Sequence, residues 1–188
     1  MITTYLFPAM WIAYLIYWQV SSQHVKAAER REPGLSRLVR LVSLLAAVGL
    51  LTLPGFLFPL LNRRFLPVSP WWFWSAAVIT AAGLLFSVWA RRRLGKNWSQ
   101  AVTLKEDHEL ITSGPYALVR HPIYTGLLTA LLGSAIARGE WRGLLAVALV
   151  LIPLWRKLTL EENWMRSRFG DSYEAYARRV SRLVPFII

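Results

Sequence analysis

The sequence predicts an all-α integral membrane protein: five transmembrane helices, a C-terminal helical hairpin and a cytoplasmic interfacial C-terminal helix. Two observations lead to this class. The 188 residues are 55% hydrophobic and include 10 Trp, and the mean hydropathy is +0.38, whereas soluble domains are about 45–50% apolar. Five apolar stretches also approach the ~20 helical residues that cross a bilayer core of ~30 Å. These stretches are 2–20, 38–61, 71–90, 122–137 and 141–160.

The first and fourth stretches need justification as spans. Stretch 2–20 lacks a basic leading region and an A-x-A-like cleavage site, so we interpret it as a retained span and not a signal peptide. Stretch 122–137 has only 16 residues, or ~24 Å of helix. We expect it to form a tight hairpin with the fifth stretch through "RGEWRG". The chain has no cysteine, which excludes disulfides and a cysteine nucleophile.

The positive charge is distributed unevenly over the loops. The net charge is +12, and of the 22 Lys and Arg only Arg63, Arg64, Arg138 and Arg142 fall on one side of the predicted membrane. The other 18 fall on the opposite side, which the positive-inside rule assigns to the cytoplasm. This pattern predicts an external N-terminus and an internal C-terminus, and the compact chain suggests a prokaryotic inner membrane. It favours membrane lipids over nucleic acid as the partner of the basic loops.

The polar residues divide the single domain 1–188 into two parts. Residues 1–90 form a three-helix scaffold, and residues 91–188 hold the polar segments on the predicted cytoplasmic side. The fourth stretch also carries a stripe of small residues that favours close helix packing. The stripe consists of Gly126, Ala130, Gly133 and Ala137.

The first polar motif is "SGPYALVRHPIYTG". A residue before proline avoids the α region and proline favours the first helical position, so a helix should begin at Pro122 with His121 at its mouth. The first N–H groups of that helix would favour an anion. The alternative is that Arg120 and His121 reach out to lipid headgroups.

The second motif is "RKLTLEENWMRSRFGDSYEAYARRV". Lys157 and Glu161 are four residues apart, as are Glu162 and Arg166, so each pair shares a helix face. Carboxylates beside a membrane usually have a partner or a functional role, and simple salt bridging at a helix end is the alternative. After Gly170 an apolar stripe predicts a helix lying on the cytoplasmic leaflet. Its members are Tyr173, Tyr176, Val180 and Leu183.

Together, "DHELITSGPYALVRHPIYTG" and "EENWMRSRFGDSYEAYARRVSRLVPF" resemble the isoprenylcysteine carboxyl methyltransferase family, which is related to the phospholipid methyltransferases. The resemblance implies a membrane enzyme that transfers a methyl group from S-adenosylmethionine to a lipophilic acceptor arriving from the bilayer. It also implies the residues that contact this cofactor. They are His108, Glu109, Leu110, Ile111, Tyr116, His121, Pro122, Ile123, Tyr124 and Glu161.

The candidate catalytic residues are Lys157, Arg120 and Glu162. The resemblance places Lys157 where the eukaryotic enzymes have an arginine that handles the substrate carboxylate. Lysine keeps the charge but loses the two-pronged geometry. The acceptor therefore stays open among prenylated cysteine carboxylates, isoprenoid acids, phospholipid amines and small thiols. No metal is implied, and an amine acceptor would have only His108 or His121 as a base.

Two alternatives of other classes remain. Sterol reductases share a similar hairpin and an "RHP" element but use NADPH, and they are generally longer. A non-catalytic membrane protein could use the same polar segments to bind lipid or a partner. A soluble Rossmann-type methyltransferase is excluded because the chain contains no G-x-G.

Overall fold

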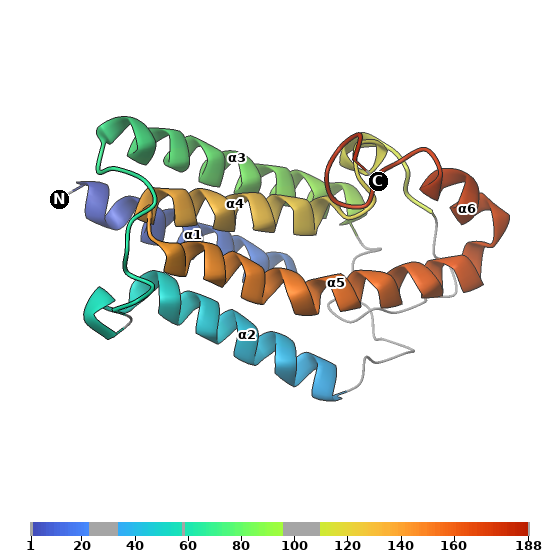
Figure 1. Ribbon diagram of the computed structural model, residues 1–188. Coiled ribbons are helices and arrows are strands. Elements are labelled where there is room, and N and C mark those ends of the chain that lie inside the picture. The colour runs from blue at the N-terminus through green and yellow to red at the C-terminus, as the bar shows by residue number, and fades with distance from the viewer. Residues whose placement is uncertain (1, 23–33, 58, 96–109, 188) are drawn as a thin grey trace.

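The computed structural model describes residues 2–22, 34–57, 59–95 and 110–187 (Figure 1). These residues form six α-helices and no β-sheet beyond isolated bridges, which confirms the all-α class. The helices are α1 (Ile2–Ser22), α2 (Gly34–Thr52), α3 (Pro70–Leu94), α4 (Pro122–Arg138), α5 (Trp141–Phe169) and α6 (Asp171–Ala177). Short 3-10 turns lie at Gly55–Leu57 and Gly114–Ala117.

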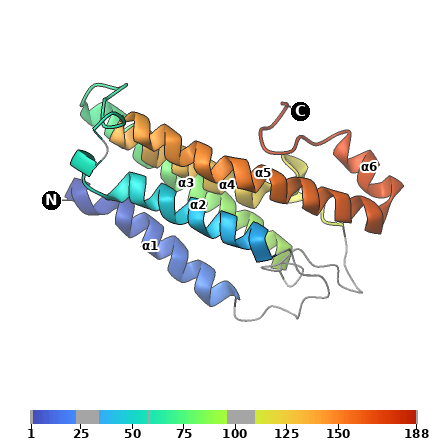
Figure 2. The ribbon, with the colours of Figure 1, turned by 60° about the horizontal axis from the view of Figure 1, so that its bottom comes forward.

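Helices α1 to α5 run side by side as a bundle, and α5 extends beyond it to meet α6 (Figures 1 and 2). Within the part of the chain that the structure describes, α2, α3 and α5 are long and apolar enough to cross a membrane. Helix α4 has 17 residues, and α1 is rich in Tyr and Trp. Length and composition thus support three of the five predicted spans. The five-span topology and its orientation stay predictions.

The predicted stripe of small residues lies where α4 packs against α3. A Cβ atom on Gly126 would lie 2.5 Å from the Gly83 carbonyl oxygen, and one on Gly133 would lie 2.8 Å from the Thr80 nitrogen. The two backbones are therefore in direct contact, which only glycine permits at these positions.

Helix α1 is joined to this pair by two side-chain hydrogen bonds, one buried and one partly buried. Trp11 donates its indole N–H to Ser134 of α4 at 3.0 Å, and the Tyr14 hydroxyl lies 2.8 Å from Ser87 of α3. Polar groups inside a bilayer need partners within the protein, so these contacts fix the position of α1.

The tight α4–α5 hairpin is present as predicted. Gly139 ends α4 with a φ of 64°, and α5 begins two residues later. The buried Arg142 guanidinium contacts Glu140 at 2.5 Å and donates to the Leu53 carbonyl at 2.7 Å. Cations favour helix C-termini, so these contacts tie the hairpin to the end of α2.

The C-terminal segment differs from the predicted interfacial helix. Helix α6 ends at Ala177, and Tyr173, Tyr176 and Leu183 are buried in the protein and do not face lipid. The Tyr176 hydroxyl donates to the Tyr116 carbonyl at 2.7 Å. Since this contact turns the stripe toward the bundle, the prediction that it faces the leaflet is wrong.

Candidate active site

The two sequence motifs meet where α4 begins. His121 is non-helical, with φ −124°, and α4 starts at Pro122 as predicted. Residues 181–183, which we call the C-terminal strap, run along this start. The Arg120 and His121 amides donate to the carbonyls of strap residues 181 and 182 at 2.8 and 3.1 Å. The Thr125 hydroxyl donates to the carbonyl of residue 183 at 2.7 Å.

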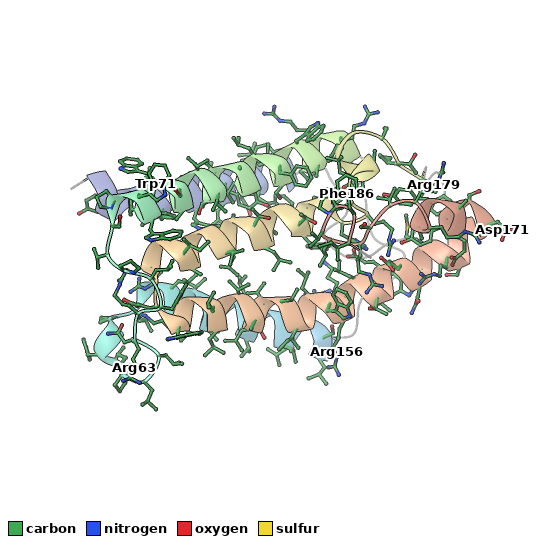
Figure 3. The ribbon with its side chains drawn as sticks, turned by 45° about the horizontal axis from the view of Figure 1, so that its top comes forward. Arg63, Trp71, Arg156, Asp171, Arg179 and Phe186 are labelled. Atoms are coloured by element: carbon green, nitrogen blue, oxygen red, sulfur yellow. The ribbon has the colours of Figure 1, made fainter. Side chains whose placement is uncertain are left out.

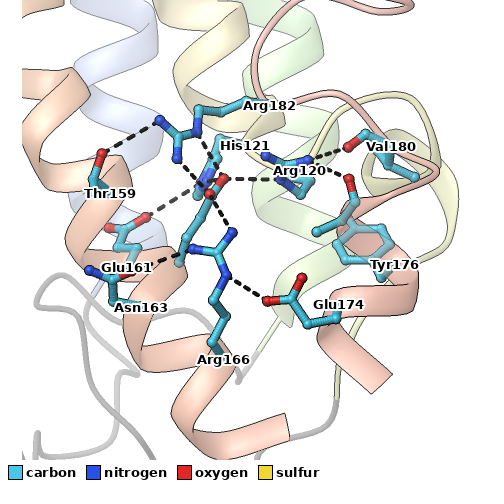
Figure 4. A network of polar contacts seen from close by, with 12 residues as sticks. Arg120, His121, Thr159, Glu161, Asn163, Arg166, Glu174, Tyr176, Val180 and Arg182 are labelled. Atoms are coloured by element: carbon cyan, nitrogen blue, oxygen red, sulfur yellow. Dashed lines mark hydrogen bonds and ion pairs between the residues drawn. The ribbon is translucent and has the colours of Figure 1, made fainter. Parts of the chain in front are cut away.

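Glu162 is the centre of a buried ion-pair network. Figure 4 shows its partners Arg120, His121, Arg166 and Arg182 converging on one another. One carboxylate oxygen accepts from Arg120 Nε at 3.0 Å, Arg182 Nε at 3.0 Å and His121 Nε2 at 3.1 Å. The other accepts from Arg182 Nη2 at 2.6 Å and lies 3.8 Å from Arg166 Nη2. The side chain is only 1% exposed. It therefore joins α4, α5 and the strap through charge-assisted hydrogen bonds, which are stronger than neutral ones.

Arg120 also binds the chain that follows α6. Its Nη1 donates to the carbonyls of Ala177 and Val180 at 2.8 and 2.5 Å. The side chain is mostly buried, as is that of His121, so neither reaches lipid headgroups. The alternative that these two residues contact the membrane surface does not hold.

His121 lies between the two adjacent glutamates. Its Nδ1 is 3.5 Å from Glu161 Oε2, and its Nε2 is 3.1 Å from Glu162 Oε1. Burial alone would lower the pKa of His121, but the hydrogen bonds and charges of both glutamates outweigh it and raise this pKa. The two glutamates thus favour the protonated imidazole, and because both ring nitrogens face carboxylates, neither is available as a base.

Glu161 has different surroundings from Glu162. The Tyr124 hydroxyl donates to it at 3.0 Å, and Lys157 Nζ lies 3.5 Å away, as the four-residue spacing predicts. The Lys157 ammonium also lies 5.2 Å from the centre of the Tyr124 ring. The Glu161 side chain is 19% exposed. Of the two glutamates, Glu161 is thus the one that can still meet a ligand.

An apolar cluster adjoins these charged groups. Ala90, Tyr116 and Ile123 are buried together, with Ile111 and Tyr124 packed against them. The structure therefore brings together six of the residues expected to contact the cofactor. They are Ile111, Tyr116, His121, Ile123, Tyr124 and Glu161. Pro122 is buried at the start of α4 and Leu110 is half-buried, while His108 and Glu109 lie outside the described residues.

Sequence reasoning missed Arg182, which makes the shortest contact to Glu162. Arg182 also stacks over the Trp155 ring, with its guanidinium carbon 4.7 Å from the ring centre. The sequence contains no signal that separates Arg182 from the exposed Arg178 and Arg179. The apolar Leu183 beside it was assigned to the lipid-facing stripe, whereas the structure buries it against α5.

The fold and the charged cluster define a helical membrane protein with a site at one end of a hairpin, and the comparisons identify its family. The family described as phospholipid methyltransferase matches residues 71–172, more than half of the chain. The chain therefore belongs to this family.

Its similarity to isoprenylcysteine methyltransferases is direct. The Schizosaccharomyces pombe protein-S-isoprenylcysteine O-methyltransferase is 40% identical over 96 residues, which cover 50% of this chain and 41% of that protein. A probable enzyme of the same name from Oryza sativa subsp. indica is 31% identical over 128 residues, 65% of this chain and 67% of that protein. The family resemblance predicted from the two motifs is confirmed.

The fold is shared with a solved structure of the eukaryotic intramembrane Ras methyltransferase ICMT (isoprenylcysteine carboxyl methyltransferase). The TM-score is 0.59 at 24% identity, over 78% of this chain and 52% of that one. The matched region thus spans about half of the solved chain, and less than half of the Schizosaccharomyces pombe relative.

Proposed function

We propose that this chain transfers a methyl group from S-adenosylmethionine to the carboxylate of a lipophilic, isoprenylcysteine-type acceptor. The observation that carries the proposal is the group formed by Glu161, His121, Tyr124 and Lys157, which combines a partly exposed carboxylate with cations beside an apolar cluster. The family and the names of the relatives support it.

The residues present fit S-adenosylmethionine, which carries an ammonium, a carboxylate, a sulfonium and a ribosyl adenine. The Glu161 carboxylate can accept from an ammonium or from ribose hydroxyls, and the first N–H groups of α4 suit a carboxylate. The apolar cluster around Tyr116 suits the adenine ring. When bound, this cofactor would supply an electrophilic methyl group for in-line attack by the acceptor oxygen, with S-adenosylhomocysteine as the leaving group. The chain's own contribution is to align the partners and exclude water.

The surroundings of His121 favour a carboxylate acceptor over an amine that would need this residue as its base. An amine must arrive neutral or lose a proton, but both ring nitrogens of His121 face carboxylates. An ionised carboxylate needs no base. Lys157 supplies a positive charge at this site to orient it, 3.5 Å from Glu161 and next to the Tyr124 ring.

We assign Arg120 and Glu162 as positioning residues. Their contacts are to the protein itself: to His121, to the strap and to the carbonyls that follow α6. They hold His121 and the strap in place, whereas the cofactor contacts Glu161 and the acceptor carboxylate contacts Lys157. We further propose that this end of the bundle faces the cytoplasm, because it lies opposite Arg63, one of the four basic residues assigned to the external side (Figure 3).

The test uses the full chain reconstituted in vesicles. S-adenosylhomocysteine should bind saturably by titration calorimetry and NADPH should not. S-adenosylmethionine with a labelled methyl group should then methylate S-farnesylcysteine. Because the expected product is an ester, mild base should release the label as methanol. Base-stable label would identify methylation of the amine instead, and binding of NADPH alone would place the chain with the reductases.

Two variants locate the cofactor. His121→Ala and Glu161→Ala should each weaken S-adenosylhomocysteine binding, whereas Asp171→Ala, at the exposed start of α6, should not. Normal affinity in both site variants would remove them from the cofactor site.

A further inference from the structure

The last described residues, 184–187, form a short turn that leaves the protein surface directly after the strap. Leu183 is buried against Leu154 and Leu158 of α5, with Tyr124 and Leu128 packed on the same cluster. The next four residues are Val184, Pro185, Phe186 and Ile187, none of them polar. We call residues 184–187 the C-terminal turn.

The turn directs its apolar side chains away from the protein. Phe186 is 97% exposed, Ile187 63% and Val184 50%. The Ile187 amide donates to the Val184 carbonyl at 3.1 Å, which closes the turn. Phe186 has a φ of 64°, a left-handed conformation that few residues other than glycine and asparagine adopt. A strained turn that leaves a phenyl ring in water is unfavourable, so the ring should have an apolar environment.

The position of the turn indicates which environment this is. Arg182, two residues before Val184, stacks over the half-exposed Trp155 of the candidate span α5. A Trp beside an Arg is typical of a membrane–water interface. Figure 3 shows Phe186 close to the end of the helical bundle. Arg179 and Asp171 lie farther from the bundle, where α5 extends beyond it. The turn therefore lies near the level at which α5 changes from apolar to charged.

We propose that the C-terminal turn inserts into the interface of the lipid bilayer and that this insertion holds the strap against α4. The outer face of α5 next to the strap is itself apolar and exposed at Ile152 and Trp155, so lipid that covers this face can also reach the turn. The strap accepts the Arg120 and His121 amides, and Arg182 binds Glu162. Insertion of the turn into lipid would thereby stabilise the strap and, through Arg182, the ion-pair network around Glu162.

The chain contains no cysteine, which permits clean single-site labelling. Phe186→Cys in the full chain would carry an environment-sensitive fluorophore in vesicles of phosphatidylcholine and phosphatidylglycerol. Its emission should be shifted to the blue and quenched by nitroxide-labelled acyl chains. Aqueous iodide should quench it several-fold less than the same label at Ser172→Cys, an exposed site at the start of α6. Val184→Cys provides a second position if the first variant folds poorly.

Equal quenching by iodide at positions 186 and 172 would overturn the proposal. So would self-quenching that rises with protein density in the absence of lipid quenching, since a second copy would then cover the turn. For the strap, hydrogen exchange of the Arg120 and His121 amides in vesicles should be faster in Phe186→Asp and unchanged in Phe186→Leu. Unchanged exchange in Phe186→Asp would show that insertion does not hold the strap.

Discussion

Replacing Glu162 by glutamine tests whether the buried network holds the strap in place. The substitution preserves the shape of the side chain but removes its charge, and the new amide group would present N–H donors to arginine donors. Arg120, His121 and Arg182, which now contact the carboxylate at 2.6–3.1 Å, would lose their counter-charge in a largely buried site.

The size of the effect follows from burial. Removing one partner of a buried ion pair costs about 3–5 kcal/mol, because the remaining charge is left unpaired. At 1.36 kcal/mol per factor of ten this is about 150- to 5,000-fold in a local equilibrium. Glu174 is a matched control: it contacts Arg166 at 2.8 Å, but both side chains are exposed, and such pairs contribute about 0–1 kcal/mol.

Native-state hydrogen exchange measures the result, since local opening exposes the Arg120 and His121 amides that now bond to the strap. We expect both amides to exchange faster by about 150- to 5,000-fold in Glu162→Gln and to change less than about tenfold in Glu174→Gln. Equal, small changes in the two variants would refute the view that Glu162 holds the strap.

Three further predictions address the acceptor, the titration of His121 and the helix packing. Lys157→Ala should leave S-adenosylhomocysteine binding intact and lower kcat/KM by about 10- to 150-fold, the loss of one charged hydrogen bond; an unchanged kcat/KM with the prenylcysteine acceptor would remove Lys157 from the site. Because the pKa of His121 is raised in the folded state, its stabilising contribution is complete below the ordinary value of 6.5 and is lost as the pH rises through the raised pKa. The thermal midpoint should therefore fall over this range and fall less in His121→Gln; parallel profiles would contradict the assignment. Gly126→Ala should destabilise the protein by about 1–3 kcal/mol in detergent unfolding, since its Cβ would meet the Gly83 carbonyl at 2.5 Å, whereas Gly49→Ala, with its nearest contact at 3.5 Å, should not.

The features predictable from sequence were those governed by local rules. The preference of proline for the first helical position placed the start of α4 at Pro122, and the four-residue spacing paired Lys157 with Glu161. The apolar stretches predicted α1 to α5, although α2 begins at Gly34 and already ends at Thr52, short of the predicted stretch 38–61; the tight hairpin followed from "RGEWRG". Each of these depends on residues close together in the chain.

The strap could not be predicted, because its contacts join residues about 60 positions apart, such as Arg120 with Ser181 and Thr125 with Leu183. The apolar stripe after Gly170 fits both a lipid-facing helix and a segment packed on the bundle. Which of the two forms depends on the hydrogen bonds that Arg120 donates to the carbonyls of Ala177 and Val180, where helix α6 ends. Periodicity contains no information about that partner.

The two neighbouring glutamates contact different partners. Successive residues of a helix point about 100° apart, so Glu162 faces the strap while Glu161 faces Tyr124 and Lys157. His121 contacts both carboxylates, through different ring nitrogens. A change in the strap can therefore reach Glu161 through the orientation and charge of His121. Cofactor affinity should consequently respond to strap variants such as Arg182→Ala, even though Arg182 lies on the Glu162 side of the network.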